Sequence, residues 1–369
     1  MPGSKDLVSS SAGRFPVVIW QEIARFAVGS LRQWISLSHV NKTVHQAMQH
    51  PRVLSHCKIY LHNALHAQKL NVGVRRLSLA FAPLLDSTLA VTPHILDRLP
   101  NLQYLDLSST NITTLQHLQA LPNLLTLVLR QCSALRSLSE LRRWPSLTHL
   151  DVQQSMPWRG SLEVICALPK LEWLSFNRCH LADEDMDQFV PCHTLTSLDL
   201  SFAELTNKGL SHLAMLPNLE VLILSHMSAI THVGPLSSLT KLRTLYLDGC
   251  TSLWDIAAIA CLRQLTMLNM LKCVNVIDLA PLSGLTRLQS LVVGHSRIHD
   301  LTPLSSLHQL RSLGLNGCKH VSYLDALENL PLEYLDLTDC NPSLRAQALA
   351  RGNVQGEAQN RNVFTFVRT

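Results

Sequence analysis

Cysteine and histidine are the residue types with the most capacity for chemistry in this chain. Its 369 residues include 10 Cys and 18 His, which could ligate metals, form disulfides or act in nucleophilic catalysis. Neither a C-x-x-C pair nor an H-E-x-x-H motif occurs. His62 and His66 are four residues apart, which fits an exposed helix face better than a metal pair. We therefore predict no metal and no cofactor.

Other catalytic patterns are missing as well. The sequence has no G-x-S-x-G elbow and no Walker loop. His149 and Asp151 lie two residues apart, but no nucleophile in a known pattern joins them. The acidic cluster at residues 183–187 could be read as a calcium site, although carboxylates at a helix N-terminus explain it better. We expect a protein that is not an enzyme.

The composition indicates what kind of scaffold positions these residues. Hydrophobic residues make up 47% of the chain, whereas aromatic residues make up 5% and charged residues 15%. A leucine core with few large rings suits many thin, similar layers better than one thick globule. The composition therefore favours a repeat architecture.

A leucine pattern recurs along most of the chain. The pattern L-x-x-L-x-L-x-x-C/S/T occurs at intervals of 22–24 residues after a first step of 28 residues. Its twelve frames begin at Val74, Leu102, Leu124, Leu147, Leu171, Leu195, Leu219, Leu242, Leu265, Leu288, Leu310 and Leu332. Because the second and third leucines are two residues apart, they point to one face of an extended strand. Stacked frames would form a parallel sheet over a shared core.

From about Val74 to Cys340 the sequence resembles the leucine-rich-repeat family. The resemblance implies an α/β solenoid, a horseshoe of about twelve repeats with a parallel sheet on its concave face. The ninth position turns inward, and six frames place a cysteine there: Cys132, Cys179, Cys250, Cys273, Cys318 and Cys340. These thiols are explained as small buried hydrophobes. So many free thiols favour a reducing compartment, the cytoplasm or the nucleus.

The outer side of the repeats is expected in two styles. The frames from Leu171 and Leu195 have apolar spacing typical of short α-helices, with Asp183 and Thr206 as N-caps. Later frames carry a proline and fewer apolar residues, which indicates 3₁₀ turns.

The segment before the repeats, residues 14–73, is predicted to form a small helical module. It has apolar helical patterns broken at Gly29-Ser30 and His50-Pro51, and it resembles the F-box. That resemblance implies docking to the adaptor subunit of a cullin-type ubiquitin ligase through Phe15, Pro16, Ile19, Ile23, Leu31, Leu37 and Val40. The segment departs from the motif at Asn41 and Val44, which the family fills with cysteine and tryptophan. The alternative is a helical cap for the solenoid.

Charge distinguishes the N-terminal segment from the rest of the chain. Residues 1–73 hold eight Lys or Arg and two acids, a net charge of +6, and the remaining 23 bases and 24 acids give −1. Neither a membrane-spanning apolar run nor a secretory leader is evident, and a mitochondrial presequence is a minor alternative. Residues 1–13 are expected to be a flexible N-terminus, 74–340 the solenoid and 341–369 a C-terminal cap. The cap would hold a closing helix, a polar loop over Gly352–Asn362 and a final strand.

A partner is expected on the concave face, at side chains between the strand leucines. Interfaces favour aromatic and arginine anchors, here with aspartates as charged guides. The candidates are Tyr104, Asp106, Arg130, His149, Asp151, Trp173, Asn177, Asp199, Tyr246 and Met267. Because these positions mix acids with bases, a nucleic acid is disfavoured there.

Two functions fit this organisation. The first is a substrate receptor of a cullin-type ubiquitin ligase, which presents a protein target on the concave face and does no chemistry itself. The alternative is a scaffold subunit of a large assembly, with the N-terminal helices acting only as a cap. A regulator of an enzyme would rest on fold analogy alone.

Overall fold

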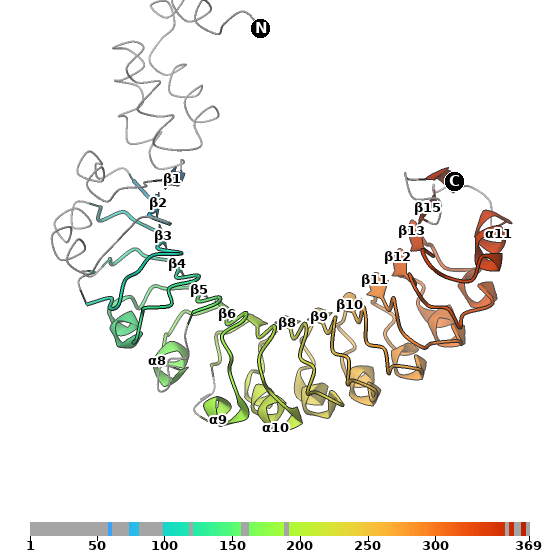
Figure 1. The fold of residues 1–369 in the computed structure, drawn as a ribbon, viewed down its shortest axis with the longest axis horizontal. Coiled ribbons are helices and arrows are strands. Elements are labelled where there is room, and N and C mark those ends of the chain that lie inside the picture. Colours follow the sequence, from blue (N-terminus) through green and yellow to red (C-terminus); the bar gives the residue numbers. More distant parts are fainter. Residues whose placement is uncertain are drawn as a thin grey trace, which may run out of the picture. The chain divides into compact units, whose positions relative to one another are not determined.

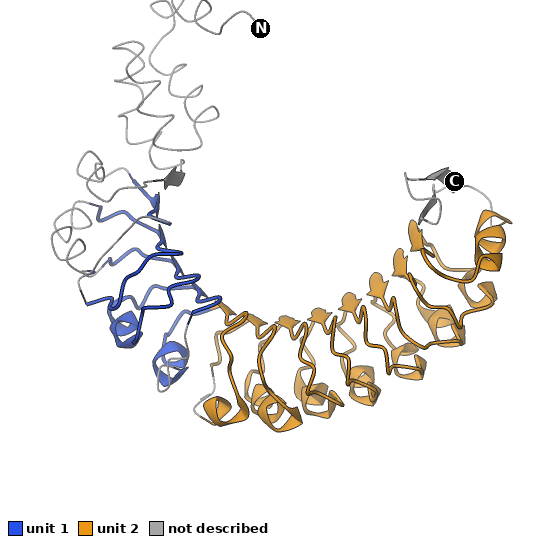
Figure 2. Ribbon diagram, viewed as in Figure 1, with its two compact units in different colours: residues 1–171 blue, residues 172–369 orange. Residues whose placement is uncertain are grey.

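The computed structural model describes residues 58–60, 74–80, 99–116, 118, 121–155, 162–187, 192–350, 354–357 and 363–366. The chain divides into two compact units, Met1–Leu171 (unit 1) and Glu172–Thr369 (unit 2; Figure 2). In both units the described residues form leucine-rich repeats, in which a short strand is followed by a return along the outer side. No helix in the described parts of the chain is both long and apolar enough to cross a bilayer.

The described residues of unit 1 include five parallel strands of three residues each. They are β1 (Lys58–Tyr60), β2 (Arg76–Ser78), β3 (Tyr104–Asp106), β4 (Thr126–Val128) and β5 (His149–Asp151). The strands pair in chain order, with equivalent residues of successive frames, such as Leu105 and Leu127, opposite one another. Strand β1 lies inside the segment that we predicted to be helical, so the ladder begins one strand before the first predicted frame.

Unit 2 continues the same pattern with eight parallel strands. They are β6 (Trp173–Ser175), β7 (Ser197–Asp199), β8 (Val221–Ile223), β9 (Thr244–Tyr246), β10 (Met267–Asn269), β11 (Ser290–Val292), β12 (Ser312–Gly314) and β13 (Tyr334–Asp336). They too pair in chain order with equivalent positions opposite one another. Each of the twelve predicted frames therefore contains one strand, and the predicted repeat architecture is confirmed.

The core is built from the leucines at the first, fourth and sixth positions of each frame. In the frame of Leu242, for example, Leu242, Leu245 and Leu247 are fully buried. Burying one leucine contributes about 1.5–3 kcal/mol. Since a single frame supplies only a few such side chains, each repeat depends on its neighbours for a closed core.

Between β6 and β13 the outer side changes from α-helix to 3₁₀ helix along the chain. Unit 1 has η2 (Ser139–Arg143) and α8 (Leu162–Cys166); unit 2 has α9 (Asp183–Met186), α10 (Asn207–Leu210), η3 (Ser211–Met215), η4 (Gly234–Ser238), η5 (Ala257–Cys261), η6 (Ala280–Leu282), η7 (Thr302–Ser306) and η8 (Asp325–Leu327). In unit 2 the strands line the inner side of the arc and these helices lie outside (Figure 1). The predicted short α-helices in the frames from Leu171 and Leu195, and the later 3₁₀ turns, are confirmed.

One of the two predicted N-caps is wrong. Thr206 does cap α10, since its hydroxyl oxygen accepts a hydrogen bond from the Lys208 amide at 3.2 Å. The N-cap of α9 is instead Ala182, and Asp183 is the first helical residue. The Asp183 carboxylate accepts hydrogen bonds from the backbone amides of Thr206 and Gly209 in the next repeat, both at 2.9 Å. It joins two repeats instead of capping its own helix.

A left-handed residue follows each strand. From the frame of Leu102 onward, the eighth residue of every frame has a positive φ, from 53° at Gln154 to 74° at Gly249. This conformation turns the chain so that the ninth residue lies beneath the next layer. Because it costs a non-glycine residue about 1–2 kcal/mol, its recurrence shows that packing of the repeats outweighs local strain.

The C-terminal segment contains a helix and an antiparallel pair of strands. The predicted closing helix is present as α11 (Ser343–Ala350), in which Leu344 and Ala348 are buried. Strand β15 (Val363–Phe366) pairs antiparallel with β13, as the final strand that we predicted. The prediction of a loop over Gly352–Asn362 is wrong in part, because β14 (Val354–Glu357) pairs with β15. The sequence of β14 has no apolar alternation, so its place in the sheet depends on its pairing with β15.

Candidate functional site

The strand face of unit 2 carries a group of half-buried apolar side chains. Val221, Ile223, Tyr246 and Met267 lie on the adjacent strands β8, β9 and β10, and we call these four residues the apolar strand patch. The register places Ile223 opposite Tyr246. The Tyr246 hydroxyl donates to the Met267 sulfur at 3.3 Å, so the structure brings these two predicted site residues together.

Asp199 and Asn177 also lie together on this face. Asp199 Oδ1 accepts hydrogen bonds from the Ser201 amide and hydroxyl at 2.9 and 2.6 Å. Its Oδ2 accepts from Ser175 Oγ at 3.3 Å and from Asn177 Nδ2 at 3.2 Å. The carboxylate is therefore engaged by four donors of the protein itself. Trp173, on β6, is half-buried at the start of the same face.

The strand face of unit 1 is polar, and each of its two arginines, Arg76 and Arg130, contacts another side chain. The Arg76 guanidinium lies over the Tyr104 ring, 5.1 Å from the centroid. Arg130 Nε donates to Asp151 Oδ2 at 2.6 Å, and the exposed fractions of the two side chains are 53% and 5%. His149 is exposed beside Thr148, whose hydroxyl lies 2.9 Å from its ring Nδ1.

Asp106, the last residue of β3, is held by hydrogen bonds in the same way as Asp199 of unit 2. Its Oδ1 accepts from the Ser108 amide at 3.0 Å and hydroxyl at 2.6 Å, and its Oδ2 accepts from Ser78 Oγ at 3.0 Å. Asp106 and Asp151 are both buried. We had predicted them as charged guides for a partner, but their carboxylates brace the sheet, and the exposed charge here is that of Arg130.

The three predicted ring side chains Tyr104, His149 and Trp173 are divided between the two units. Trp173 belongs to unit 2, whereas Tyr104 and His149 belong to unit 1, so neither unit contains all three. The predicted adaptor-docking residues at positions 15–40 lie outside the described residues.

A row of stacked side chains at the strand ends was missed by the sequence analysis. Arg178, Phe202 and His226 occupy the eighth position of three successive frames. The Arg178 guanidinium lies 3.9 Å from the Phe202 ring centroid, and the Phe202 and His226 rings stack at 4.4 Å with an interplanar angle of 13°. A Cβ on Gly249, the next residue in the row, would lie 2.5 Å from His226 Nδ1. The signal in the sequence is a glycine one repeat after a histidine, and it recurs at His295 and Gly317.

The cysteine ladder is structural. The Cys250 and Cys273 thiols donate to the carbonyls of Leu224 and Leu247, each one repeat earlier, at 3.2 and 3.1 Å. Burial raises the pKa of the Cys250 thiol to about 12 and that of Cys340 to about 11. Such thiols stay protonated near neutral pH and are poor nucleophiles. The described residues include no cluster of three His, Cys, Asp or Glu that could hold a metal ion.

Comparison with known proteins agrees with the repeat architecture. A family model described as leucine-rich repeats, two copies, matches residues 100–143. No curated protein sequence matches the chain. Among solved structures, an internalin from Listeria monocytogenes has 23% identity and a TM-score of 0.44, with 66% of this chain and 69% of that chain covered.

Two further structures have higher TM-scores. A leucine-rich-repeat protein from Leptospira interrogans has 19% identity and a TM-score of 0.52, with 83% of this chain and 90% of that one covered. The crystal structure of a TLR13–ssRNA13 complex has 22% identity and a TM-score of 0.56, with 79% of this chain covered. This chain spans 48% of that TLR13 chain. At these identities the likeness concerns the fold, and the fold is that of a leucine-rich-repeat protein.

Proposed function

We propose that this chain is a non-catalytic protein-binding module whose partner is held by the apolar strand patch of unit 2. The observation that carries the proposal is the contiguity of Val221, Ile223, Tyr246 and Met267 on three adjacent strands. Contiguous apolar surface that remains accessible marks interaction sites, and tyrosine and methionine are enriched in interface cores.

The scaffold suits binding because its side chains are already positioned. The patch stands on strands locked in one register over fully buried leucines such as Leu222 and Leu245. Little conformational freedom is therefore lost on association. The proposal of a non-catalytic role is supported by Asp199, whose carboxylate is occupied by hydrogen bonds from within the sheet.

Photo-crosslinking tests this proposal directly. Tyr246 is replaced by benzoylphenylalanine in the full-length chain, the protein is irradiated in cells, and adducts are identified by mass spectrometry. The matched control carries the same group at Ser322, which is exposed between β12 and η8. We expect a protein adduct at Tyr246 that is absent at Ser322 and is lost in Met267→Lys. Identical adducts at both positions, or none at Tyr246, would refute the proposal.

The more specific role as a receptor of a cullin-type ubiquitin ligase rests on the F-box resemblance of residues 14–73. Under this role the N-terminal segment would dock on the adaptor while the strand face presents the target, in the cytoplasm or the nucleus. The alternative role is a scaffold subunit whose N-terminal segment only caps the repeats.

Because β1 pairs with β2, a truncation that tests this role must leave Lys58–Tyr60 in place. The full-length chain and a version without residues 1–50 are purified by affinity tag, and their partners are identified. Adaptor and cullin subunits recovered only with the full-length chain would support the receptor role. Recovery of one common assembly without ligase subunits from both versions would favour the scaffold. If the full-length chain were instead imported into mitochondria with loss of its N-terminus, the proposed location in the cytoplasm or the nucleus would be wrong.

A further inference from the structure

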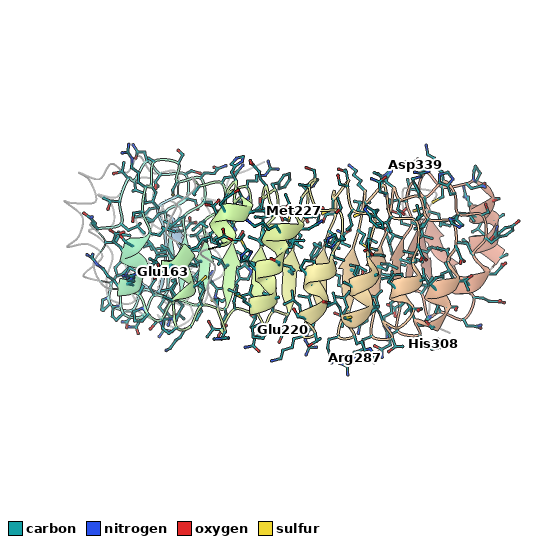
Figure 3. The ribbon with its side chains drawn as sticks, turned by 90° about the horizontal axis from the view of Figure 1, so that it is seen from below. Glu163, Glu220, Met227, Arg287, His308 and Asp339 are labelled. Atoms are coloured by element: carbon teal, nitrogen blue, oxygen red, sulfur yellow. The ribbon has the colours of Figure 1, made fainter. Side chains whose placement is uncertain are left out.

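Exposed cations line one edge of unit 2, where the chain returns from the outer side into strands β9–β12. These residues, which we call the basic edge, are Lys241, Arg243, Arg263, Arg287 and Arg311. Figure 3 shows Arg287 on this edge together with His308, whereas Met227 and Asp339 lie on the opposite edge. The returning segments 234–244, 257–267, 280–290 and 302–312 contain no Asp or Glu. These four segments therefore carry only basic charged side chains.

Neutral side chains hold two of these cations. Lys241 Nζ donates to Asn218 Oδ1 at 2.6 Å, and the Arg287 guanidinium donates to Gln264 Oε1. Both acceptors lie one repeat before the cation. An amide acceptor orients a cation without neutralising it. Arg263 lies between the two and forms no ion pair with the described residues.

Two glutamates mark the ends of the row. Arg243 Nε lies 3.3 Å from Glu220 Oε2, and Arg311 pairs with Glu333 Oε1 at 2.5 Å. Setting these two pairs aside leaves Lys241, Arg263 and Arg287, in three successive returning segments, as cations with no ion pair among the described residues.

The acids of the same repeats lie at the other end of the 3₁₀ helices. Asp255, Asp278 and Asp300 accept hydrogen bonds from the backbone amides that open η5, η6 and η7, at 2.9, 2.7 and 2.8 Å. Positive and negative side chains are thus segregated to opposite ends of each outer helix. In each of these repeats the acid precedes the outer helix and the cation follows it.

We propose that the basic edge binds an extended acidic segment of a partner protein. Neighbouring strands are about 4.8 Å apart, and the repeats fan out from the strands toward the outer side (Figure 1). An extended peptide places alternate side chains on one face, about 6–7 Å apart, so successive acidic side chains can face the cations of successive repeats. A line of positive charge complements such a segment along its length.

Two other anionic partners fit the edge less well. Proteins that bind single-stranded nucleic acid usually interleave aromatic side chains for base stacking, and the four returning segments contain no Phe, Tyr or Trp. Proteins that bind membrane surfaces combine cations with exposed apolar side chains. None of the large exposed apolar side chains comes from these segments. The proposal concerns a different surface from the apolar strand patch, so either can hold without the other.

The test uses the full-length protein and a fluorescein-labelled peptide of glutamates, with affinity measured by fluorescence anisotropy at low and physiological salt. The variant is the triple substitution Lys241→Gln, Arg263→Gln and Arg287→Gln. The matched control is Lys272→Gln, Arg297→Gln and Lys319→Gln, which removes the same charge from exposed positions outside the basic edge. We expect the first triple to weaken binding by roughly tenfold or more and the control by less than about threefold. Binding by the wild type should weaken as salt rises.

Carbodiimide coupling gives a readout that does not depend on the folding of a variant. With the wild-type protein, the peptide should couple to Lys241 in preference to Lys272 and Lys319. Equal loss of binding in both triples, or equal coupling at all three lysines, would show only a response to net charge and would overturn the proposal. The proposal would also be overturned if poly(U) RNA or phosphatidylserine vesicles bound more tightly than the glutamate peptide and lost this binding in the first triple variant. That result would favour the RNA or the membrane as the ligand.

Discussion

The two units are built from the same repeat, but the side chains on their strand faces differ in polarity. In unit 1 the face is polar, with Arg130 bound to the buried Asp151. In unit 2 the middle of the face is apolar, with Tyr246 against Met267. The strand-end rows differ in the same way: Ser109, Gln131 and Gln154 are joined by 2.8 Å hydrogen bonds, whereas Arg178, Phe202 and His226 are stacked. The same leucine pattern thus forms the core of each unit, while the residues on the strand surface differ between the units.

The largest effects are expected where the units are alike. Leu127→Ala in β4 and Leu245→Ala in β9 each remove a fully buried leucine at the same position of the frame. We expect each to lower the free energy of unfolding by about 2–5 kcal/mol, as measured by urea denaturation followed by circular dichroism. A large loss from one and almost none from the other would break the claim that the two cores are equivalent.

The strand-end row of unit 2 should be the next most sensitive feature. Gly249 has a φ of +74°, and an added Cβ would meet His226. Gly249→Ala should therefore cost about 2 kcal/mol and disturb the stacking of His226 on Phe202, as seen in the histidine NMR signals. Gly284→Ala is the control, since a Cβ there meets nothing within 4 Å. Equal stability of the two variants would mean that the row is not packed as described.

The ion pairs of the two units should differ in value. Arg130→Ala leaves the Asp151 carboxylate, which is 5% exposed, without its cation, and we expect a loss of about 1 kcal/mol after allowing for the exposure of Arg130. Arg243→Ala in unit 2 breaks a pair whose side chains are 55% and 47% exposed, so the loss should be only a few tenths of a kcal/mol or so. Thermal unfolding of both variants measures the difference. An effect of Arg243→Ala equal to that of Arg130→Ala would remove the distinction between a buried and a surface pair.

The smallest effect concerns the acid dependence of unit 2. Desolvation opposes ionisation of Asp183, but hydrogen bonds from Thr206 and Gly209 outweigh it, and its pKa is lowered from the ordinary value of 3.8. A lowered pKa in the folded state adds stability above pH 3.8 that is lost as the pH falls through the folded pKa. Asp183→Asn should therefore be slightly less stable than the wild type at pH 7, with a difference that shrinks under acid. A difference that does not change with pH would contradict this assignment.

The fold was predictable because the leucine period dictates it. All twelve frames contain a strand, since an interval of two residues fixes which side chains face the core. Strand β1 was missed because its frame has His56 and Ile59 at the first and fourth positions, where almost all other frames have the leucines that reveal the period. Strand β14 was missed because its polar sequence is a strand only by pairing with β15.

The site was harder to predict because contacts one repeat away decide it. A sequence shows Asp106 at an outward position of its strand, but not that Ser78 and Ser108 bury its carboxylate. The stacking of Phe202 on His226 likewise depends on two residues 24 positions apart in the printed sequence. Tyr246 and Met267 could be chosen from residue type, whereas their mutual contact could not.

The left-handed eighth residue has a consequence for how such a chain can change length. It closes each strand in the same way whether 22, 23 or 24 residues separate successive frames, so the outer segment absorbs the variation while the strand register stays fixed. A whole frame can then be duplicated or deleted between two such turns without changing how the flanking repeats pair. Growth by tandem duplication would lengthen the strand face and the basic edge together, one row at a time.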